Sequence, residues 1–341
     1  MPTERWLAAD DAEWRRLIAG AAMADSYHDA PYHQLAEARD EGSARFFVWE
    51  DGGDWLALPV LIRPIDGLAG RCDAGSVYGY AGPLASTAAP SAGLIASFRQ
   101  ALAERLRAEG VVSLVARLHP LIEQAGWLDG LGTVRPLGET VSIDLTLDDA
   151  AQLALYRSNH RRDLKRLARD GYTTERDASP PALTAFIEVY HANMRRVGAI
   201  ADYYFDADYF QGLTDALGSD FDLFVCRRDG EIAGGACFMH RGPIVQYHLG
   251  AVADAHLAAA PLKQLLDAAR HHYAAAGAHV LHLGGGRGGS DDSLLRFKSG
   301  FSPRRHPFAL WCWVIDTAAY AALTEGRPET GFFPAYRAPS V

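Results

Sequence analysis

The 341-residue chain has the composition of a globular protein, with 49% hydrophobic and 22% charged residues, which excludes disordered and fibrous classes. Its length exceeds that of most single domains, so two domains, or one domain built from two halves, are expected. The formal net charge of −9 argues against a protein that coats nucleic acid through bulk positive charge.

No targeting segment, membrane span or metal motif is indicated. Residues 1–20 carry acids and arginines throughout and lack the apolar segment of a secretory signal. No stretch approaches the roughly 18 apolar residues of a spanning helix, so we expect a cytoplasmic protein. The four cysteines form no CxxC pair, so neither a disulfide framework nor a zinc site is indicated, and we expect no metal.

The first half of the chain predicts a helix, a hairpin, a second helix and a strand. Residues 10–21 form the first helix, and residues 44–64 hold two apolar runs around a turn of the type Asp-Gly-Gly-Asp. Residues 92–110 carry apolar side chains at helical spacing and end at a glycine, after which residues 111–120 have the pattern of a strand.

The second half repeats this order. A helical region from Leu183 precedes two hairpins within residues 221–252, which turn at an Asp-Gly and at a Gly-Pro pair. Residues 261–277 then predict a helix and residues 279–283 a strand. The repetition indicates a duplicated α/β unit with a mixed sheet. We expect domains at residues 1–147 and 148–325, followed by a loose tail at 326–341.

Residues 282–301, HLGGGRGGSDDSLLRFKSGF, contain a G-x-G-x-x-G pattern that begins at Gly284, after a strand and before a helix. A dinucleotide fold requires a second parallel strand with an acid about 20 residues on, and that strand is missing. A Walker A loop requires lysine where Ser290 stands. The favoured interpretation is a tight turn into a helix that is capped by Ser290 or Asp291.

The same segment places Lys298 within an apolar frame of leucine and phenylalanine side chains. A buried ammonium is costly unless it meets an anion or a developing negative charge, so Lys298 is a candidate catalytic residue. The alternative is a surface lysine that lays its stem along apolar side chains.

A strongly basic segment opens the second half. On a helix, one side would be apolar and the other would carry six cations: Arg157, Arg161, Arg162, Lys165, Arg166 and Arg169. One interpretation is a solvated face, partly neutralised by Asp163 and Asp170. The other is a surface for a phosphate-rich partner, extended by Arg287, Arg296, Arg304 and Arg305.

The segment SLLRFKSGF, preceded by LHLGGG, resembles the C-terminal signature of the Fem family of peptidoglycan-bridge aminoacyltransferases and of their GNAT-like relatives. Further similar motifs follow in the family's order: YHDAPYH, YGYAGP, RLHP, LYRSNHRRDLKRLARDGY and YHLGAV. The resemblance implies an α/β (α+β) fold of tandem duplicated GNAT-like domains, with mixed, mostly antiparallel central sheets flanked by helices.

The resemblance also implies a function. An amino acid would pass from aminoacyl-tRNA, as co-substrate and without a cofactor, to an amine of a peptidoglycan precursor or of a peptide or secondary-metabolite intermediate. Lys298 would stabilise the oxyanion. The substrate-binding residues would be Phe297, Tyr78, Tyr80, Arg117, Tyr247 and Arg287. The tRNA-binding residues would be Arg157, Arg161, Arg162, Lys165, Arg166, Arg169, Arg304 and Arg305.

Two other functions stay open. An acyl-CoA-dependent GNAT enzyme would hold pyrophosphate on a [QR]-x-x-G-x-[GA] loop that opens a helix after a strand. The only match, residues 39–44, closes a helix and precedes a strand, and the loop after residue 250 lacks the pattern. The third alternative is a non-catalytic binding module with the same fold. The amino acid, the acceptor, the general base and the oligomeric state are not determined by the sequence.

Overall fold

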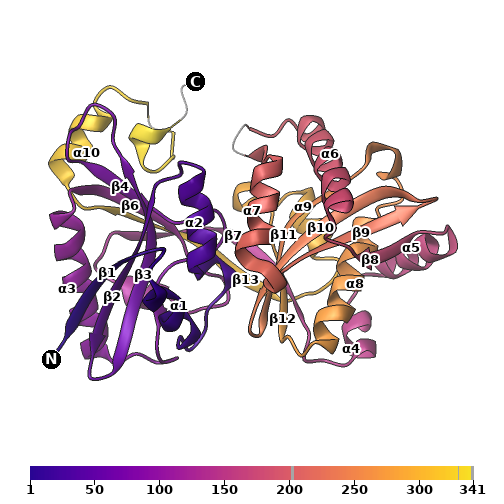
Figure 1. The fold of residues 1–341 in the computed structure, drawn as a ribbon, viewed down its shortest axis with the longest axis horizontal. Coiled ribbons are helices and arrows are strands. Elements are labelled where there is room, and N and C mark those ends of the chain that lie inside the picture. Colours follow the sequence, from indigo (N-terminus) through magenta and orange to yellow (C-terminus); the bar gives the residue numbers. More distant parts are fainter. Residues whose placement is uncertain (201–202, 329, 339–341) are drawn as a thin grey trace. The chain divides into compact units, whose positions relative to one another are not determined.

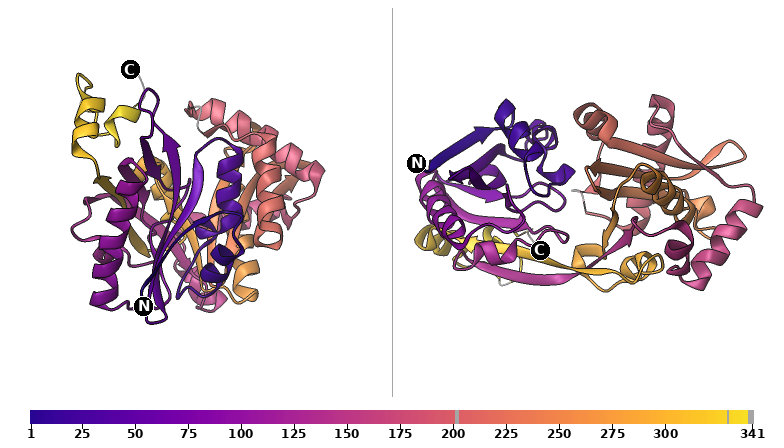
Figure 2. Two further views of the ribbon diagram at one scale, coloured as in Figure 1. Left: turned by 60° about the vertical axis from the view of Figure 1, so that its left-hand side comes forward. Right: turned by 90° about the horizontal axis from the view of Figure 1, so that it is seen from below.

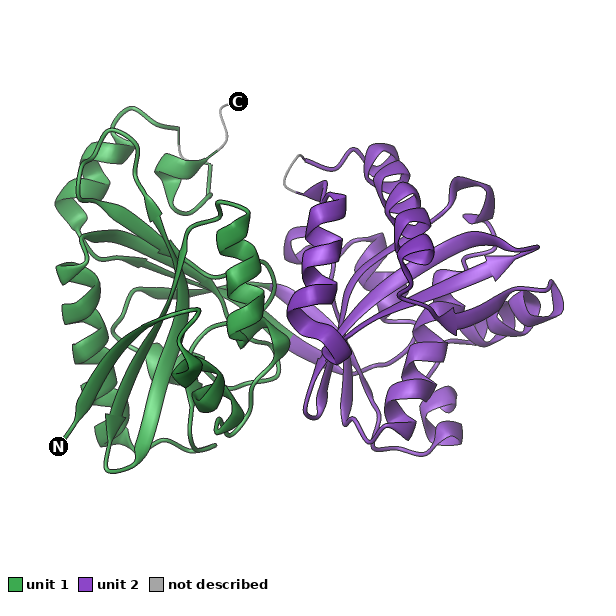
Figure 3. Cartoon of the chain, in the orientation of Figure 1, with its two compact units in different colours: residues 1–137, 307–341 green, residues 138–306 purple. Residues whose placement is uncertain are grey.

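The computed structural model describes residues 1–200, 203–328 and 330–338. The chain forms two compact units (Figure 3): unit 1 comprises residues 1–137 and 307–341, and unit 2 comprises residues 138–306. No helix of the described part is both long and apolar enough to cross a membrane.

Unit 1 is a mixed sheet with helices on both faces (Figure 1). Its strand order is β1-β2-β3-β4-β6-β13, with β5 beside β3, and neighbours are antiparallel except for the parallel pair β4 and β6. The elements are β1 (Thr3–Ala8), α1 (Ala12–Ala19), α2 (Ala30–Ala38), β2 (Ser43–Asp51), β3 (Asp54–Pro64), β4 (Cys72–Gly75), β5 (Leu84–Ala85), α3 (Ala92–Ala108), β6 (Val111–Arg117), β13 (Arg305–Val314) and α10 (Thr317–Thr324), with short 3-10 helices at Ser26–His28, Ala125–Leu128 and Ala335–Arg337.

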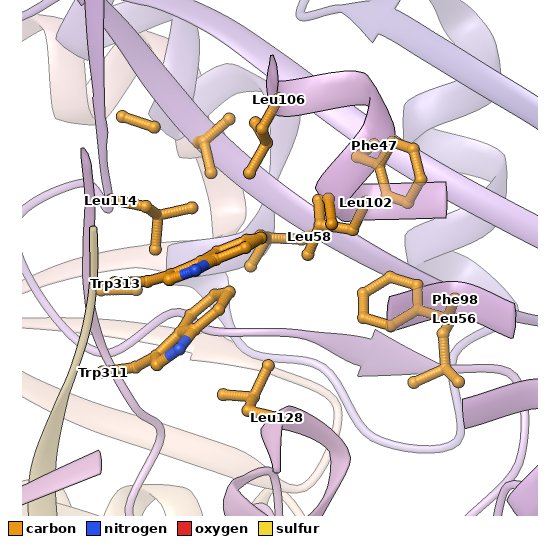
Figure 4. Packing of buried hydrophobic residues seen from close by; sticks show 14 of the residues in the cluster. Phe47, Leu56, Leu58, Phe98, Leu102, Leu106, Leu114, Leu128, Trp311 and Trp313 are labelled. Atoms are coloured by element: carbon orange, nitrogen blue, oxygen red, sulfur yellow. The ribbon is translucent and has the colours of Figure 1, made fainter. Parts of the chain in front are cut away.

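Adjacent phenylalanines of β2 supply the two faces of this sheet. Phe47 points into a core with Phe98 and Leu102 of α3, and Trp311 and Trp313 of β13 close the same core (Figure 4). Phe46 points the opposite way and stacks on Trp14 of α1 at 4.7 Å between ring centroids. The alternation of a strand therefore places α3 on one face and α1 on the other.

Unit 2 has the same architecture, and its two helical layers are visible in Figure 2. Its strand order is β7-β12-β11-β10-β9-β8, with one parallel pair, β11 and β12. The elements are β7 (Thr133–Asp144), α4 (Asp149–Ala154), α5 (Ser158–Arg169), β8 (Thr173–Arg176), α6 (Pro180–Val197), α7 (Ala207–Leu217), β9 (Phe221–Arg228), β10 (Glu231–Arg241), β11 (Ile244–Val252), α8 (Leu262–Ala275), β12 (Val280–Gly285) and α9 (Ser293–Lys298), with short 3-10 helices at Gly218–Asp220, Asp254–His256 and Arg287–Gly289.

The two units repeat one plan but exchange their last strands. In each unit, three antiparallel strands lead into a helix and a parallel strand: β2, β3, β4, α3 and β6 in unit 1, and β9, β10, β11, α8 and β12 in unit 2. The next strand in the chain then serves the other unit, because β7 pairs with β12 and β13 pairs with β6. The compact units consequently do not follow the expected boundary at 147/148, and residues 307–325 lie in unit 1 rather than in the second domain.

The expected loose tail is also corrected for its described residues. Tyr336 is buried, and its hydroxyl lies 2.7 Å from the hydroxyl of Ser113 on β6. Arg337 donates to the buried carboxylate of Asp73 on β4 at 2.8 Å. Residues 330–338 are thus held by a buried hydrogen bond and an ion pair; residues 329 and 339–341 lie outside the described part.

The strand exchange predicts that a change late in the chain destabilises the N-terminal unit. Trp311→Ala removes a ring that is 0% exposed from the core of unit 1, and we expect a loss of about 3–5 kcal/mol of unfolding free energy. Hydrogen exchange should show lost protection in β2, β3 and β6. Trp311→Phe should lose less, and equal loss of protection in β10 and β11 would contradict the assignment.

Candidate functional site

The candidate site of unit 2 lies where its two parallel strands part. β11 and β12 pair only over Ile244–Gln246 and Val280–His282. Beyond that point β11 stays with β10, and β12 stays with β7. The ladder is irregular on both strands there, between Tyr247 and Leu249 and between His282 and Gly284, and such bulges commonly lie next to active sites because they end regular pairing.

Lys298 at the end of α9 reaches into this opening. Its side chain is buried, its Nζ donates to the carbonyl oxygen of Gly285 on β12 at 2.7 Å, and it lies 5.7 Å from the ring centroid of Tyr247 on β11. Tyr247 extends along its own strand, since a Cβ at Gly250 would lie 2.2 Å from its hydroxyl. The ammonium therefore contacts both strands at the point where they separate.

The electrostatics of Lys298 suit acid and base chemistry. Burial lowers the pKa of its ammonium to about 7, although the negative charge of Asp292 opposes this shift. Both protonation states are consequently populated near neutral pH. The ammonium can donate a hydrogen bond to a developing oxyanion, and the neutral amine can accept a proton.

The glycine-rich segment 284–289 allows the backbone to pack closely around Asp292. Asp292, and not Ser290 or Asp291 as expected, caps α9 by accepting the N–H groups of Leu294 and Leu295 at 2.9 and 3.0 Å. A Cβ at Gly286 would lie 2.6 Å from that carboxylate and 2.0 Å from the Ser290 carbonyl oxygen. The glycines thus let the chain fold onto its own cap, as the tight-turn interpretation requires.

The basic helix α5 docks on the end of α9. The imidazole Nε2 of His160 lies 3.0 Å from the carbonyl oxygen of Phe297, and a Cβ at Gly300 would lie 2.2 Å from the same ring. The Arg157 N–H donates to the Gly300 carbonyl oxygen at 2.8 Å. Burial lowers the pKa of His160 to about 4, so the ring is neutral. His160 and Gly300 were not selected from the sequence; a histidine on the apolar side of α5 was the available signal.

The sequence-predicted Phe297 belongs to this junction. Its half-buried ring lies 5.6 Å from that of His160 and 5.5 Å from that of Phe301. Phe297 therefore packs α5 against α9, one residue away from the lysine that enters the strand opening.

Helix α5 also covers the N-terminus of α8. The carboxylate of Asp163 accepts from the buried Lys263 ammonium at 2.5 Å, and Arg166 donates to the carbonyl oxygen of Ala259 at 3.2 Å. The backbone N–H of Lys263 donates to the carbonyl oxygen of Ala260 at 3.1 Å, and the backbone N–H of Gln264 donates to that of Pro261 at 3.0 Å. Amides that would receive a pyrophosphate at a helix start are thus engaged within the chain.

The six cations of the basic segment differ in their surroundings. Arg161 is half-buried and donates to the carbonyl oxygens of Ala154 and Tyr156. Like Arg166, it therefore stabilises the fold, whereas the sequence predicted a position on a solvent-exposed face. Arg157 bonds the Arg296 carbonyl oxygen and Arg169 pairs with Asp170. Arg162 is 78% exposed, with Asp163 at 4.0 Å, and Lys165 is exposed.

Three other predicted cations of unit 2, Arg287, Arg304 and Arg305, form ion pairs. Arg287 is exposed and pairs with Asp292 at 3.1 Å, and Arg304 pairs with Asp144 at 2.7 Å. Arg305 donates to the Ser302 carbonyl oxygen at 3.0 Å and lies 3.9 Å from Glu139. Among the described residues, no cluster of three or more His, Cys, Asp or Glu side chains is arranged to hold a metal ion.

Three predicted residues, Tyr78, Tyr80 and Arg117, form a group of their own in unit 1. A Cβ at Gly79, whose φ is +123°, would lie 2.2 Å from the ring of Tyr27, which fixes the turn between the two tyrosines. Tyr80 packs edge-on against Phe308 at 5.3 Å. The half-buried Arg117 guanidinium lies 5.7 Å from the Tyr78 ring centroid and forms no ion pair within the described residues.

Comparison with known proteins agrees with this architecture. The model of the acetyltransferase (GNAT) domain matches residues 154–299. The structure of FemX is 14% identical, with a TM-score of 0.74, over 94% of this chain and 99% of that chain. The C-terminal domain of a putative lysylphosphatidylglycerol synthetase from Agrobacterium fabrum is 19% identical, with a TM-score of 0.58, over 92% and 95%. L-PGS from Bacillus licheniformis is 15% identical, with a TM-score of 0.57, over 91% and 93%.

No curated protein sequence matches the chain. The structural likenesses show the fold, and residues 154–299 are similar to the acetyltransferase (GNAT) domain. The expected fold class, GNAT-like units with mixed, mostly antiparallel sheets flanked by helices, is confirmed.

The contact between His160 and Gly300 predicts a coupled pair of substitutions. Gly300→Ala forces a methyl group onto the imidazole, and we expect a loss of about 1–3 kcal/mol of unfolding free energy. His160→Ala makes room for that methyl, so the double variant should lose less than the sum of the single variants. Urea unfolding checks this; strictly additive losses would exclude the contact.

The burial of Lys298 predicts a pH-dependent stability. Its pKa is lowered from 10.5 to about 7, so between these values the unfolded chain binds more protons, and wild-type stability rises with pH relative to Lys298→Met. Lys298→Met should therefore stabilise the protein most at pH 6 and least near pH 10. A difference in unfolding free energy that is equal at both pH values would contradict a buried lysine.

Proposed function

We propose that the chain is an aminoacyltransferase, which moves an aminoacyl group from aminoacyl-tRNA to an amine of an acceptor and forms an amide bond. The observation that carries the proposal is the buried Lys298 ammonium in the opening between β11 and β12, on the helix against which the basic α5 is docked.

The chemistry needs one positive group at the reacting carbonyl. The acceptor amine attacks the ester carbon, the carbonyl oxygen becomes an oxyanion, and the ribose oxygen then leaves as the amide forms. Lys298 donates a hydrogen bond to the oxyanion and supplies a proton to the leaving oxygen. The neutral Lys298 amine then accepts the proton that the attacking nitrogen releases, which restores the ammonium. A pKa of about 7 makes that proton available at neutral pH. The ester is already activated, so no further cofactor is required.

Positively charged side chains are available for an anionic group of each substrate. Arg162 and Lys165 on α5 are exposed and suit the phosphates of a tRNA acceptor arm. Arg117 of unit 1, beside Tyr78, suits a carboxylate or phosphate of the acceptor, which would be a peptidoglycan precursor or a peptide or secondary-metabolite intermediate.

Acyl-CoA is the second candidate donor, and the GNAT match of residues 154–299 favours it. The packing of α5 over the N-terminus of α8 favours aminoacyl-tRNA over acyl-CoA as the donor. Asp163 and Arg166 contact the start of that helix, and residues 251–262 contain no glycine to bring backbone close to a pyrophosphate.

Label transfer from a mixture of charged tRNAs to soluble amine acceptors tests the proposal. We expect transfer by the wild type that RNase abolishes, and a loss of about 100-fold or more with Lys298→Met, because an oxyanion donor is removed. The unfolding measurements above show whether that variant is folded. If label moves only from acetyl-CoA, the acyl-CoA alternative holds and the tRNA proposal fails.

The basic surface is tested with a matched control. Arg162→Gln/Lys165→Gln should raise KM for charged tRNA and weaken its dependence on salt, because two phosphate contacts are lost. Arg15→Gln/Arg16→Gln removes two exposed cations from α1 of unit 1 and should change neither quantity. Equal effects of the two changes would show that net charge, and not this surface, attracts the tRNA.

A further inference from the structure

A second concave site lies within unit 1, built from residues that the proposed reaction does not use. It is an open pocket of about 430 Å³. Its lining comprises Thr133 and Arg135 from the start of β7, which belongs to unit 1 up to residue 137, together with Cys312, Trp313 and Val314 of β13 and Phe333 of the C-terminal segment. This volume is within the range of about 300–1,000 Å³ that is usual for small-molecule sites.

Flat apolar groups form two of its walls. Trp313 is only 7% exposed, and its ring stacks on Trp311 at 5.8 Å and 20°, so it is held by the core. The half-buried Phe333 ring stacks on Tyr320 of α10 at 5.8 Å and 20°. Gly132, with φ of +70°, lets the chain approach β13, since a Cβ there would lie 2.3 Å from the Cys312 carbonyl oxygen. The walls are therefore fixed before any ligand arrives.

Arg135 brings a positive charge that no described residue neutralises. It forms no ion pair within residues 1–200, 203–328 and 330–338, and its Nε is buried with no hydrogen-bond partner there. Its bond to the Gly331 carbonyl oxygen is long, at 3.4 Å, and its guanidinium carbon lies 6.0 Å from the Phe333 ring centroid. The described part of the chain thus supplies no counter-ion to this half-buried guanidinium.

The neighbouring thiol cannot serve as that counter-ion. Burial raises the pKa of Cys312, although the charge of Arg135 opposes the shift. The thiol therefore stays protonated and neutral at physiological pH.

We propose that this cavity binds a small organic anion that joins a carboxylate to a flat aromatic group. Arg135 holds the carboxylate through its planar fork of N–H groups, and the ring lies among Phe333 and Trp313. This inference does not depend on the proposed aminoacyl transfer, because it uses residues of unit 1 outside the Tyr78, Tyr80 and Arg117 group.

Calorimetric titration of the full chain with three probes tests the site. Benzoate carries both the charge and the ring, benzamide carries the ring without the charge, and inorganic phosphate carries the charge without the ring. We expect saturable benzoate binding that is at least about 10-fold tighter than either of the other two, since each lacks one contact. Absence of saturable benzoate binding, or equal affinity for benzamide or phosphate, would overturn the proposal.

Variants assign the binding to the cavity. Arg135→Gln should weaken benzoate at least about 10-fold, while Arg15→Gln, an exposed arginine on α1, should leave it unchanged. Phe333→Ala keeps the charge and should weaken the two ring-bearing probes, benzoate and benzamide, but not phosphate. Because the comparison of probes uses wild-type protein, misfolding of a variant cannot decide the outcome. Benzoate affinity that survives both Arg135→Gln and Phe333→Ala would place the binding elsewhere and reject the inference.

Discussion

The desolvated ammonium of Lys298 is the constraint on which the arrangement of unit 2 depends. A cation without water requires a fixed acceptor and a favourable face, and the chain supplies the Gly285 carbonyl oxygen and the ring of Tyr247. Both contacts lie beyond the last paired residues of β11 and β12. The position of the lysine thus depends on the opening of the sheet, since continued pairing of β11 with β12 would fill the space that the ammonium occupies.

Helix α5 joins this centre to a charged surface. Its inner side contacts α9 through His160 and covers the start of α8 through Asp163 and Arg166, whereas Arg162 and Lys165 face outward. A substitution on the inner side therefore affects the lysine-bearing helix and the entrance of α8 together. The basic side chains divide into those that build the unit and those that remain available to a partner.

Much of the fold could be predicted from the sequence, because the repeated order of hairpins, helix and strand is a local pattern. The apolar frame around Lys298 left two interpretations open, a buried ammonium and a surface lysine, and the structure shows the buried one. The strand exchange could not be predicted, since the alternation in β7 and β13 is the same whichever sheet they join. The cap of α9 was misassigned because Ser290, Asp291 and Asp292 are all good capping residues, and only the packing at Gly286 selects the last.

The exchange of strands also sets an order of assembly on the ribosome. Residues 138–306 are contiguous, so unit 2 is fully synthesised before the chain reaches Trp311 and Trp313. The nascent N-terminal segment meanwhile exposes the edge of β6, with its backbone groups and part of its core still uncovered. Unit 1 begins first and is completed last, so a prematurely terminated polypeptide would carry a finished C-terminal half and an unfinished, aggregation-prone N-terminal one.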